Sequence, residues 1–146
     1  MYTFIKLTVP PPSMIIFDAS NRDQCEVKRL KTNTPLQALI MMNDPTVLEA
    51  SRVLSQKLLE EKKDEDYNLT KAFRLIICRK PDDKEMGILK SYYNEELQLF
   101  NQNKLSADTT LQQGEYTHDD KLDKSSTAAL MKTIQMIYNM DEAITK

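Results

Sequence analysis

The chain of 146 residues contains only two glycines, two cysteines, one histidine and no tryptophan. Two glycines are too few for the many tight hairpins of an all-β sandwich, so the composition favours long helices. Two cysteines do not define the disulfide framework of a small secreted domain. A lone histidine cannot supply the constellation that a metal or acid–base site requires.

The sequence also lacks long apolar runs and any strong excess of charge. No run of apolar residues is long enough to cross a bilayer, so we expect no membrane insertion. The formal net charge of −2 comes without clustered lysine and arginine, which argues against nucleic-acid binding. The first nine residues do not have the three regions of a signal peptide, and a chain expressed as it stands is expected in the cytoplasm.

The most informative segment is Arg29–Pro45, which contains two helix starts. Thr34 is a good N-cap, Pro35 suits the first helical position, and Gln37 completes a capping box. Asp44-Pro45 repeats the cap and the proline for the next helix. We therefore predict two consecutive helices that meet at Asn43, a residue that tolerates the left-handed conformation.

Hydrophobic periodicity predicts three further helices. The five expected helices span residues 35–42, 45–61, 69–79, 83–101 and 125–144, with Asp82 as the cap of the fourth. The predicted core includes Leu48, Ala50, Leu58, Leu69, Phe73, Leu89, Tyr93, Met131 and Ile134. Residues 103–124 are polar and aperiodic, and such a long loop suggests a function or docking onto another domain.

Residues 1–33 form a different kind of segment, a proline-rich arm followed by a polar loop. Val9-Pro-Pro-Pro12 favours an extended run, yet the residues around it are strongly apolar. Such an arm is expected to pack on the helices that follow or on protein outside the chain. The predicted fold is therefore all-α: an irregular bundle of about five helices in residues 34–146, with an extended proline-rich N-terminal arm and a single domain overall.

Candidate chemical groups are isolated in the sequence. His118 has no evident partner, and we interpret it as an exposed loop histidine rather than a base or ligand. An acidic loop lacks the spacing and glycine of an EF-hand, so a solvated loop is favoured over a cation site. Its members are Asp108, Glu115, Asp119, Asp120 and Asp123. We therefore predict no catalytic residue, no metal site and no cofactor.

The sulfur-containing residues have ordinary explanations. Cys25 lies near Arg22, Lys28 and Arg29, whose charge could activate a thiol, but a structural thiol or a contact to another domain is favoured. Cys78 falls on a helical apolar pattern and is interpreted as a small buried hydrophobe rather than half of a disulfide. The methionines at 41, 42, 131, 136 and 140 are expected to fill the core.

A polar cluster surrounds the two helix starts. One hypothesis makes it an interaction surface at exposed helix N-termini; the favoured alternative is that the side chains satisfy those N–H groups themselves. The residues of this cap cluster are Arg29, Asn33, Thr34, Gln37, Asn43 and Asp44.

The segments Thr32-Asn-Thr-Pro-Leu-Gln-Ala-Leu39 and Asn43-Asp-Pro45 resemble one known family, the C-terminal domain of large planctomycete proteins that also carry a c-type cytochrome domain. Further points of similarity are Tyr2-Thr-Phe4, Thr8–Pro12, Phe17-Asp18, Cys25, Ala72-Phe-Arg74, Arg79, Pro81, Glu85, Gly114-Glu115 and Asn139–Glu142.

This resemblance implies no catalytic residues, and the chain has no Cys-x-x-Cys-His motif for a c-type haem. It implies that the chain is the C-terminal part of a larger exported protein, periplasmic or on the cell surface. We therefore expect a non-enzymatic interaction or scaffold module whose partner is its own upstream domain or another copy of the chain. The alternative is a fragment that completes an enzyme active site, for polysaccharide-related chemistry, in the intact parent.

Overall fold

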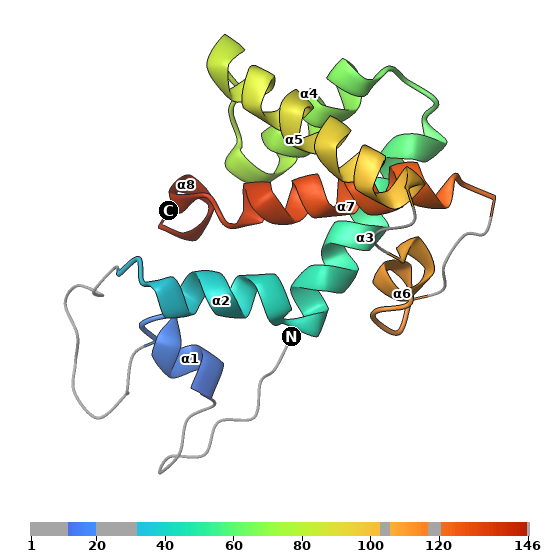
Figure 1. Cartoon of the computed structure of the whole chain (residues 1–146). Helices are drawn as coiled ribbons and strands as arrows, with labels where there is room; N and C mark the ends of the chain where they lie inside the picture. Colours follow the sequence, from blue (N-terminus) through green and yellow to red (C-terminus); the bar gives the residue numbers. More distant parts are fainter. Residues whose placement is uncertain (1–11, 20–31, 103–105, 117–120, 146) are drawn as a thin grey trace.

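The computed structural model describes residues 12–19, 32–102, 106–116 and 121–145. Within these ranges the regular structure is entirely helical, which confirms the all-α prediction (Figure 1). Five helices have nine residues or more, and three are short. The helices are α1 (Pro12–Ile16), α2 (Pro35–Asn43), α3 (Pro45–Glu60), α4 (Glu65–Ile77), α5 (Asp83–Asn101), α6 (Ala107–Leu111), α7 (Lys124–Tyr138) and α8 (Asp141–Ile144).

Helix α7 is the centre of the bundle. It crosses the middle of the molecule and contacts α2, α3, α4, α5, α6 and α8 (Figure 1). The five consecutive residues from Thr127 to Met131 are all buried, so this part of α7 is covered on every side. A helix that is enclosed all round behaves as the core of the domain rather than as an amphipathic surface helix.

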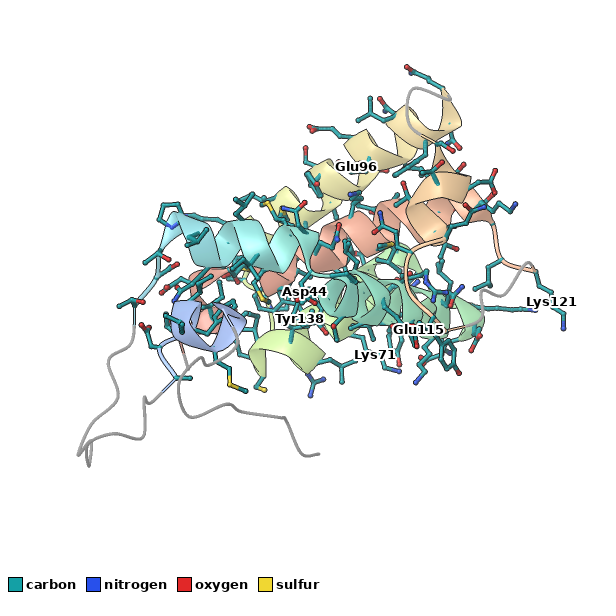
Figure 2. All side chains as sticks on the ribbon, turned by 90° about the horizontal axis from the view of Figure 1, so that it is seen from below. Asp44, Lys71, Glu96, Glu115, Lys121 and Tyr138 are labelled. Carbon is teal, nitrogen blue, oxygen red and sulfur yellow. The ribbon has the colours of Figure 1, made fainter. Side chains whose placement is uncertain are left out.

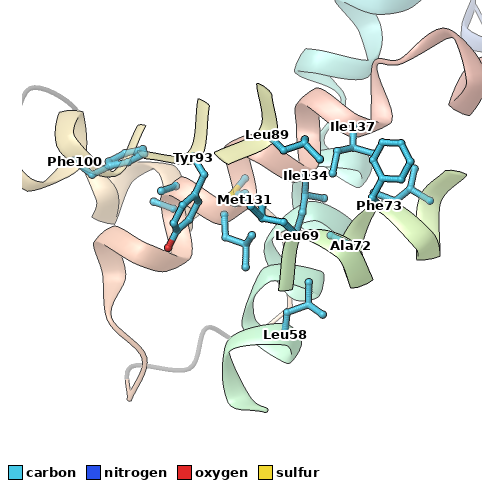
Figure 3. Packing of buried hydrophobic residues seen from close by; sticks show 14 of the residues in the cluster. Leu58, Leu69, Ala72, Phe73, Leu89, Tyr93, Phe100, Met131, Ile134 and Ile137 are labelled. Atoms are coloured by element: carbon cyan, nitrogen blue, oxygen red, sulfur yellow. The ribbon is translucent and has the colours of Figure 1, made fainter. Parts of the chain in front are cut away.

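The hydrophobic core joins α7 to the inward faces of α4 and α5, as Figure 3 shows. The apolar stripe predicted for α4 is buried, and the inward residues predicted for α5 and α7 are buried or pack against the core, except for Tyr92 on α5, which is partly exposed. The buried apolar residues are Leu58, Leu69, Ala72, Phe73, Ile76, Ile77, Leu89, Tyr93, Phe100, Leu111, Ala128, Ala129, Leu130, Met131, Ile134 and Ile137.

The buried face of α3 differs from the prediction. Ala50 was expected in the core but is exposed, whereas the polar residues Ser51, Arg52 and Ser55 are buried. The two serines satisfy their hydroxyls within the helix, because Ser51 donates to the carbonyl of Val47 and Ser55 to that of Arg52. Polar groups that find such partners can be buried at little cost in free energy. The prediction of the buried face of α3 from its apolar residues was therefore wrong.

The three predicted helix caps are confirmed. Thr34 and Gln37 form a capping box at α2, and Asp82 forms another with Glu85 at α5. The carboxylate of Asp44 accepts from the backbone N–H groups of Thr46 and Val47 at α3. These caps accept hydrogen bonds from backbone N–H groups that have no partner within the helix. Because few residue types can do this, the caps can be predicted from the sequence.

The junction between α2 and α3 is tighter than predicted. Asn43 was expected to end α2 in the left-handed conformation, but it is still helical and does not have a positive φ. Its side chain donates to the carbonyl of Leu39, and the extended Asp44 ends one helix and caps the next. Asp44 alone therefore forms the junction, and no residue in the left-handed conformation is needed between the two helices.

Several other predictions about the helices were wrong. The arm was predicted to be irregular, yet α1 begins at Pro12, because a proline at the first helical position needs no N–H partner. Helix α4 begins at Glu65 rather than Leu69 and ends at Ile77 rather than Arg79. The predicted last helix is interrupted at Asn139 and Met140, which separate α7 from α8. The polar loop contains α6.

The central position of α7 leads to a stability prediction. Ile134 is fully buried, and Ile134→Ala should lower the free energy of unfolding by about 2–5 kcal/mol, because it loses buried methyl groups and leaves a cavity. Ile88, which is 62 % exposed on α5, is the matched control, and Ile88→Ala should change it by less than about 0.5 kcal/mol. Urea unfolding followed by circular dichroism measures both; equal effects would contradict the placement of α7.

Candidate functional site

The cap cluster is held together by Gln37, which is 1 % exposed. Its side-chain carbonyl accepts from the backbone N–H of Thr34, while its amide nitrogen donates to the carbonyl of Ile16 at 2.7 Å and to the hydroxyl of Thr32 at 3.1 Å. A capping residue thus also fastens α1 to the start of α2. The sequence predicted the cap but not this second role.

Two further hydrogen bonds extend the cluster. The carboxylate of Asp18 accepts from both the backbone N–H and the hydroxyl of Thr32, and these bonds lower the pKa of Asp18 below its ordinary value. The side-chain amide of Asn33 donates to the carboxylate of Asp141 at 2.6 Å, which links the segment before α2 to α8. The cluster therefore joins three parts of the chain that are distant in the sequence.

Every described member of the cap cluster has an intramolecular partner. Asn33, Thr34, Gln37, Asn43 and Asp44 all make hydrogen bonds within the chain. Figure 2 labels Asp44 near the junction of α2 and α3. Arg29, the sixth member, lies outside the described residues. The polar atoms of these five residues thus serve the fold, and the capping interpretation accounts for their types and spacing.

An apolar surface lies beside this polar cluster. Five large apolar side chains on α1, the turn after it and α2 remain between 37 % and 56 % exposed. Helices α1 and α2 contact each other, so these side chains belong to one region of the molecule. We call this region the α1–α2 apolar surface; it consists of Ile15, Phe17, Leu36, Leu39 and Met42. Met42 was predicted to fill the core, and that prediction was wrong.

A second polar assembly surrounds Arg79, just after α4. Its guanidinium forms paired hydrogen bonds with Glu85 at 2.6 and 2.7 Å and with Glu142 at 2.9 Å. It also lies over the ring of Phe73, 5.0 Å from the ring centre. The assembly connects the end of α4 to the starts of α5 and α8. Two bidentate pairs on one guanidinium give a strongly directional contact.

The charges of this assembly shift one another's ionisation. Arg79 and the N–H of Asp82 lower the pKa of Glu85 to about 2, and Arg79 also lowers the pKa of Glu142. The two carboxylates raise the pKa of Arg79. Sequence reasoning from spacing missed this assembly, although Arg79, Glu85 and Glu142 were all among the residues that carry the family resemblance.

The described part of the polar loop docks on α3 of the same chain. Arg52 is 1 % exposed and donates to the carbonyls of Gln113 and Tyr116, while Glu49 accepts from the backbone N–H of Tyr116. Gly114 has a φ of 93°, and a Cβ atom on it would lie 2.8 Å from the side chain of Glu49. A glycine is therefore needed for both the turn and the close approach.

Of the remaining candidates, only those within the described residues can be placed. His118, Asp119, Asp120 and Cys25 lie outside the described residues. Asp108 pairs with Lys124, and Asp123 caps α7. Among the described residues, no group of three or more histidine, cysteine, aspartate or glutamate side chains could hold a metal ion.

Cys78 does not occupy the predicted buried position. It is exposed and ends α4 in the left-handed conformation, with a φ of 67°. Because the helix ends at Ile77, the apolar pattern stops one residue before the thiol. The interpretation of Cys78 as a small buried hydrophobe was therefore wrong.

With the geometry established, the comparisons with known proteins place the chain in a family. A model for the PSD1 family, described as proteins of unknown function (DUF1553), matches residues 1–93. The chain belongs to this family. Its matched range includes α1 to α4, the cap cluster, Arg79 and Glu85, whereas Gly114-Glu115 and Asn139–Glu142 lie beyond it. In the same comparisons, no curated protein and no solved structure matched the chain.

The Arg79 assembly predicts a dependence of stability on pH. Because the pKa of Glu85 falls from 4.5 to about 2 on folding, its stabilising effect is complete above pH 4.5 and is lost as the pH falls toward 2. Glu85→Gln should therefore flatten the decline of unfolding free energy between these two pH values. Urea unfolding at several pH values measures it. Glu60, exposed on α3, provides the control Glu60→Gln, and identical profiles for both variants would contradict the role of the ion pair.

Alanine substitutions at the two glycines should have opposite effects on the stability of the protein. Gly114→Ala should destabilise the protein by about 1–2 kcal/mol, since alanine is strained at a positive φ, and the contact with Glu49 adds to that cost. Gly87 lies in α5 with open space around its missing Cβ, so Gly87→Ala should stabilise by about 0.5–1 kcal/mol. Thermal unfolding of both variants tests this, and an unchanged Gly114→Ala protein would show that the loop does not dock on α3.

Proposed function

We propose that this chain is a non-enzymatic helical interaction module of a larger exported multidomain protein. The observation that supports it best is the α1–α2 apolar surface. Five large apolar side chains in one region exceed the scattered exposure that is normal for a protein surface. Several exposed apolar side chains beside a cluster of polar groups are typical of a surface that another protein covers.

The rigidity of this region supports the proposal. The carbonyl of Ile16 and the hydroxyl of Thr32 both accept from Gln37, and Asn33 is tied to α8. The exposed side chains are therefore presented on a backbone that polar contacts already fix. A surface that is ordered before binding loses less conformational entropy when its partner docks.

The partner in this proposal is the upstream domain of the same parent protein. Helices α1 and α2 are the first two helices of the described fold, so the apolar surface is built from the part of the chain that is nearest in sequence to an upstream domain. The family resemblance supports the same arrangement, with a parent in the periplasm or on the cell surface that also carries a cytochrome domain. Complete burial of one large apolar side chain contributes about 1.5–3 kcal/mol, and these half-exposed residues would contribute about half of that each.

The proposal predicts the effect of two charges on this surface. The double variant Leu36→Lys and Leu39→Lys should bind the separately produced upstream polypeptide at least about tenfold more weakly than the unmodified chain, because lysine disfavours burial. Isothermal titration calorimetry measures the affinity. Binding of the neutral dye Nile red, which reports exposed apolar surface, should fall in the same variant.

The matched control places the same charges elsewhere. Ile88 and Ser91 are both exposed on α5, and the double variant Ile88→Lys and Ser91→Lys should keep the upstream polypeptide's affinity. Equal losses for both variants, or no binding by the unmodified chain, would refute the proposal. Self-association that only the first variant abolishes, seen by sedimentation, would instead identify a second copy as the partner.

A further inference from the structure

The outer face of α4 carries a groove of about 460 Å³, on a different helix from the α1–α2 apolar surface. It extends along the helix and past its end, since its lining comes from α4 and from the segment just after it. The lining residues are Tyr67, Thr70, Lys71, Arg74, Leu75 and Lys80. Lys71, labelled in Figure 2, lies near the edge of the molecule in that view. The groove therefore faces solvent rather than the core.

The charge of this groove is positive although the chain as a whole is negative. Lys71 forms an ion pair with Glu61 and lies 5.4 Å from the centre of the Tyr67 ring, so its charge is already compensated. Arg74 and Lys80 are exposed, and among the described residues neither side chain forms a hydrogen bond or ion pair. Two cations on one groove favour a ligand with carboxylates.

The groove also offers two large apolar groups. Tyr67 is 40 % exposed and Leu75 is 57 % exposed, and both lie among the cations. Tyrosine and arginine are the residue types that most often anchor protein interfaces. The cation–π contact with Lys71 holds the ring of Tyr67 in place, so one anchor is ordered before any ligand binds.

We propose that the α4 groove binds an acidic segment of a partner protein that carries a large apolar side chain. The carboxylates of the segment pair with Arg74 and Lys80, and its apolar side chain packs between Tyr67 and Leu75. The groove suits a peptide because a single helix lines nearly all of it, which leaves one side open for a chain to pass along. Arginine and lysine clusters recognise acidic motifs in this way.

This site is independent of the interaction proposed for α1 and α2. Leu36 and Leu39 do not line the groove, and the residues that line it do not belong to the α1–α2 apolar surface. The variants that test one surface therefore leave the other intact, and either proposal can fail alone.

The test uses the full chain and the acetylated, amidated peptide Glu-Leu-Glu-Phe-Glu-Leu-Glu. Isothermal titration calorimetry should detect binding at low salt that weakens at least about tenfold between about 0.05 M and about 0.5 M salt. Two-dimensional NMR should show the largest shifts in α4. The double variant Arg74→Glu and Lys80→Glu should bind at least about tenfold more weakly, and Leu75→Ser should bind more weakly at every salt concentration.

Matched controls separate this site from general attraction to charge. Lys84 and Ile88, both exposed on α5, supply Lys84→Glu and Ile88→Ser, which should bind the peptide as the unmodified chain does. A milder pair, Arg74→Gln with Lys80→Gln, covers the case in which charge reversal disturbs folding. The proposal is overturned if the peptide does not bind, if the α5 variants lose as much affinity, if the same peptide with lysines in place of glutamates binds equally well, or if vesicles of anionic lipid bind in its place.

Discussion

The burial of α7 is the constraint on which the rest of the fold depends. A helix whose middle is covered on every side needs neighbours in all directions, and α3, α4 and α5 supply most of them with α6 and α8 at the ends. Apolar burial is non-directional, so it assembles these helices without fixing their ends. The ends are fixed by polar contacts: Gln37 joins α1 to α2, Arg79 joins α4, α5 and α8, and Arg52 holds the loop after α6.

These polar contacts give several residues of the family resemblance a structural role in the described structure. Gln37, Arg79 and Glu85 use their polar atoms to connect elements, and Gly114 allows a loop to approach α3. Because these residues fix how the helices are placed, they also determine which apolar side chains remain exposed to solvent. Because α2 is apolar almost throughout and contacts the bundle with only part of its circumference, Leu36, Leu39 and Met42 remain exposed. The interaction surface that we propose is a consequence of this architecture.

The sequence predicted the features that local physics determines. The caps at Thr34, Asp44 and Asp82 and the buried stripe of α4 follow from backbone donors and helical periodicity. It did not predict that Arg52 would be buried or that Arg79 would meet Glu142, because both depend on partners more than sixty residues away. The exposure of Met42 and Cys78 was missed for a related reason: an apolar pattern says which residues suit burial, not whether a neighbour covers them.

We infer that another domain covers the α1–α2 apolar surface in the parent protein. Hydroxyl-radical footprinting of methionine tests it directly, since Met42 is 55 % exposed and Met131 is fully buried within the same chain. Met42 should be oxidised quickly in the isolated chain and protected in the parent protein, while Met131 should be protected in both. Equal, rapid oxidation of Met42 in the two proteins would contradict it.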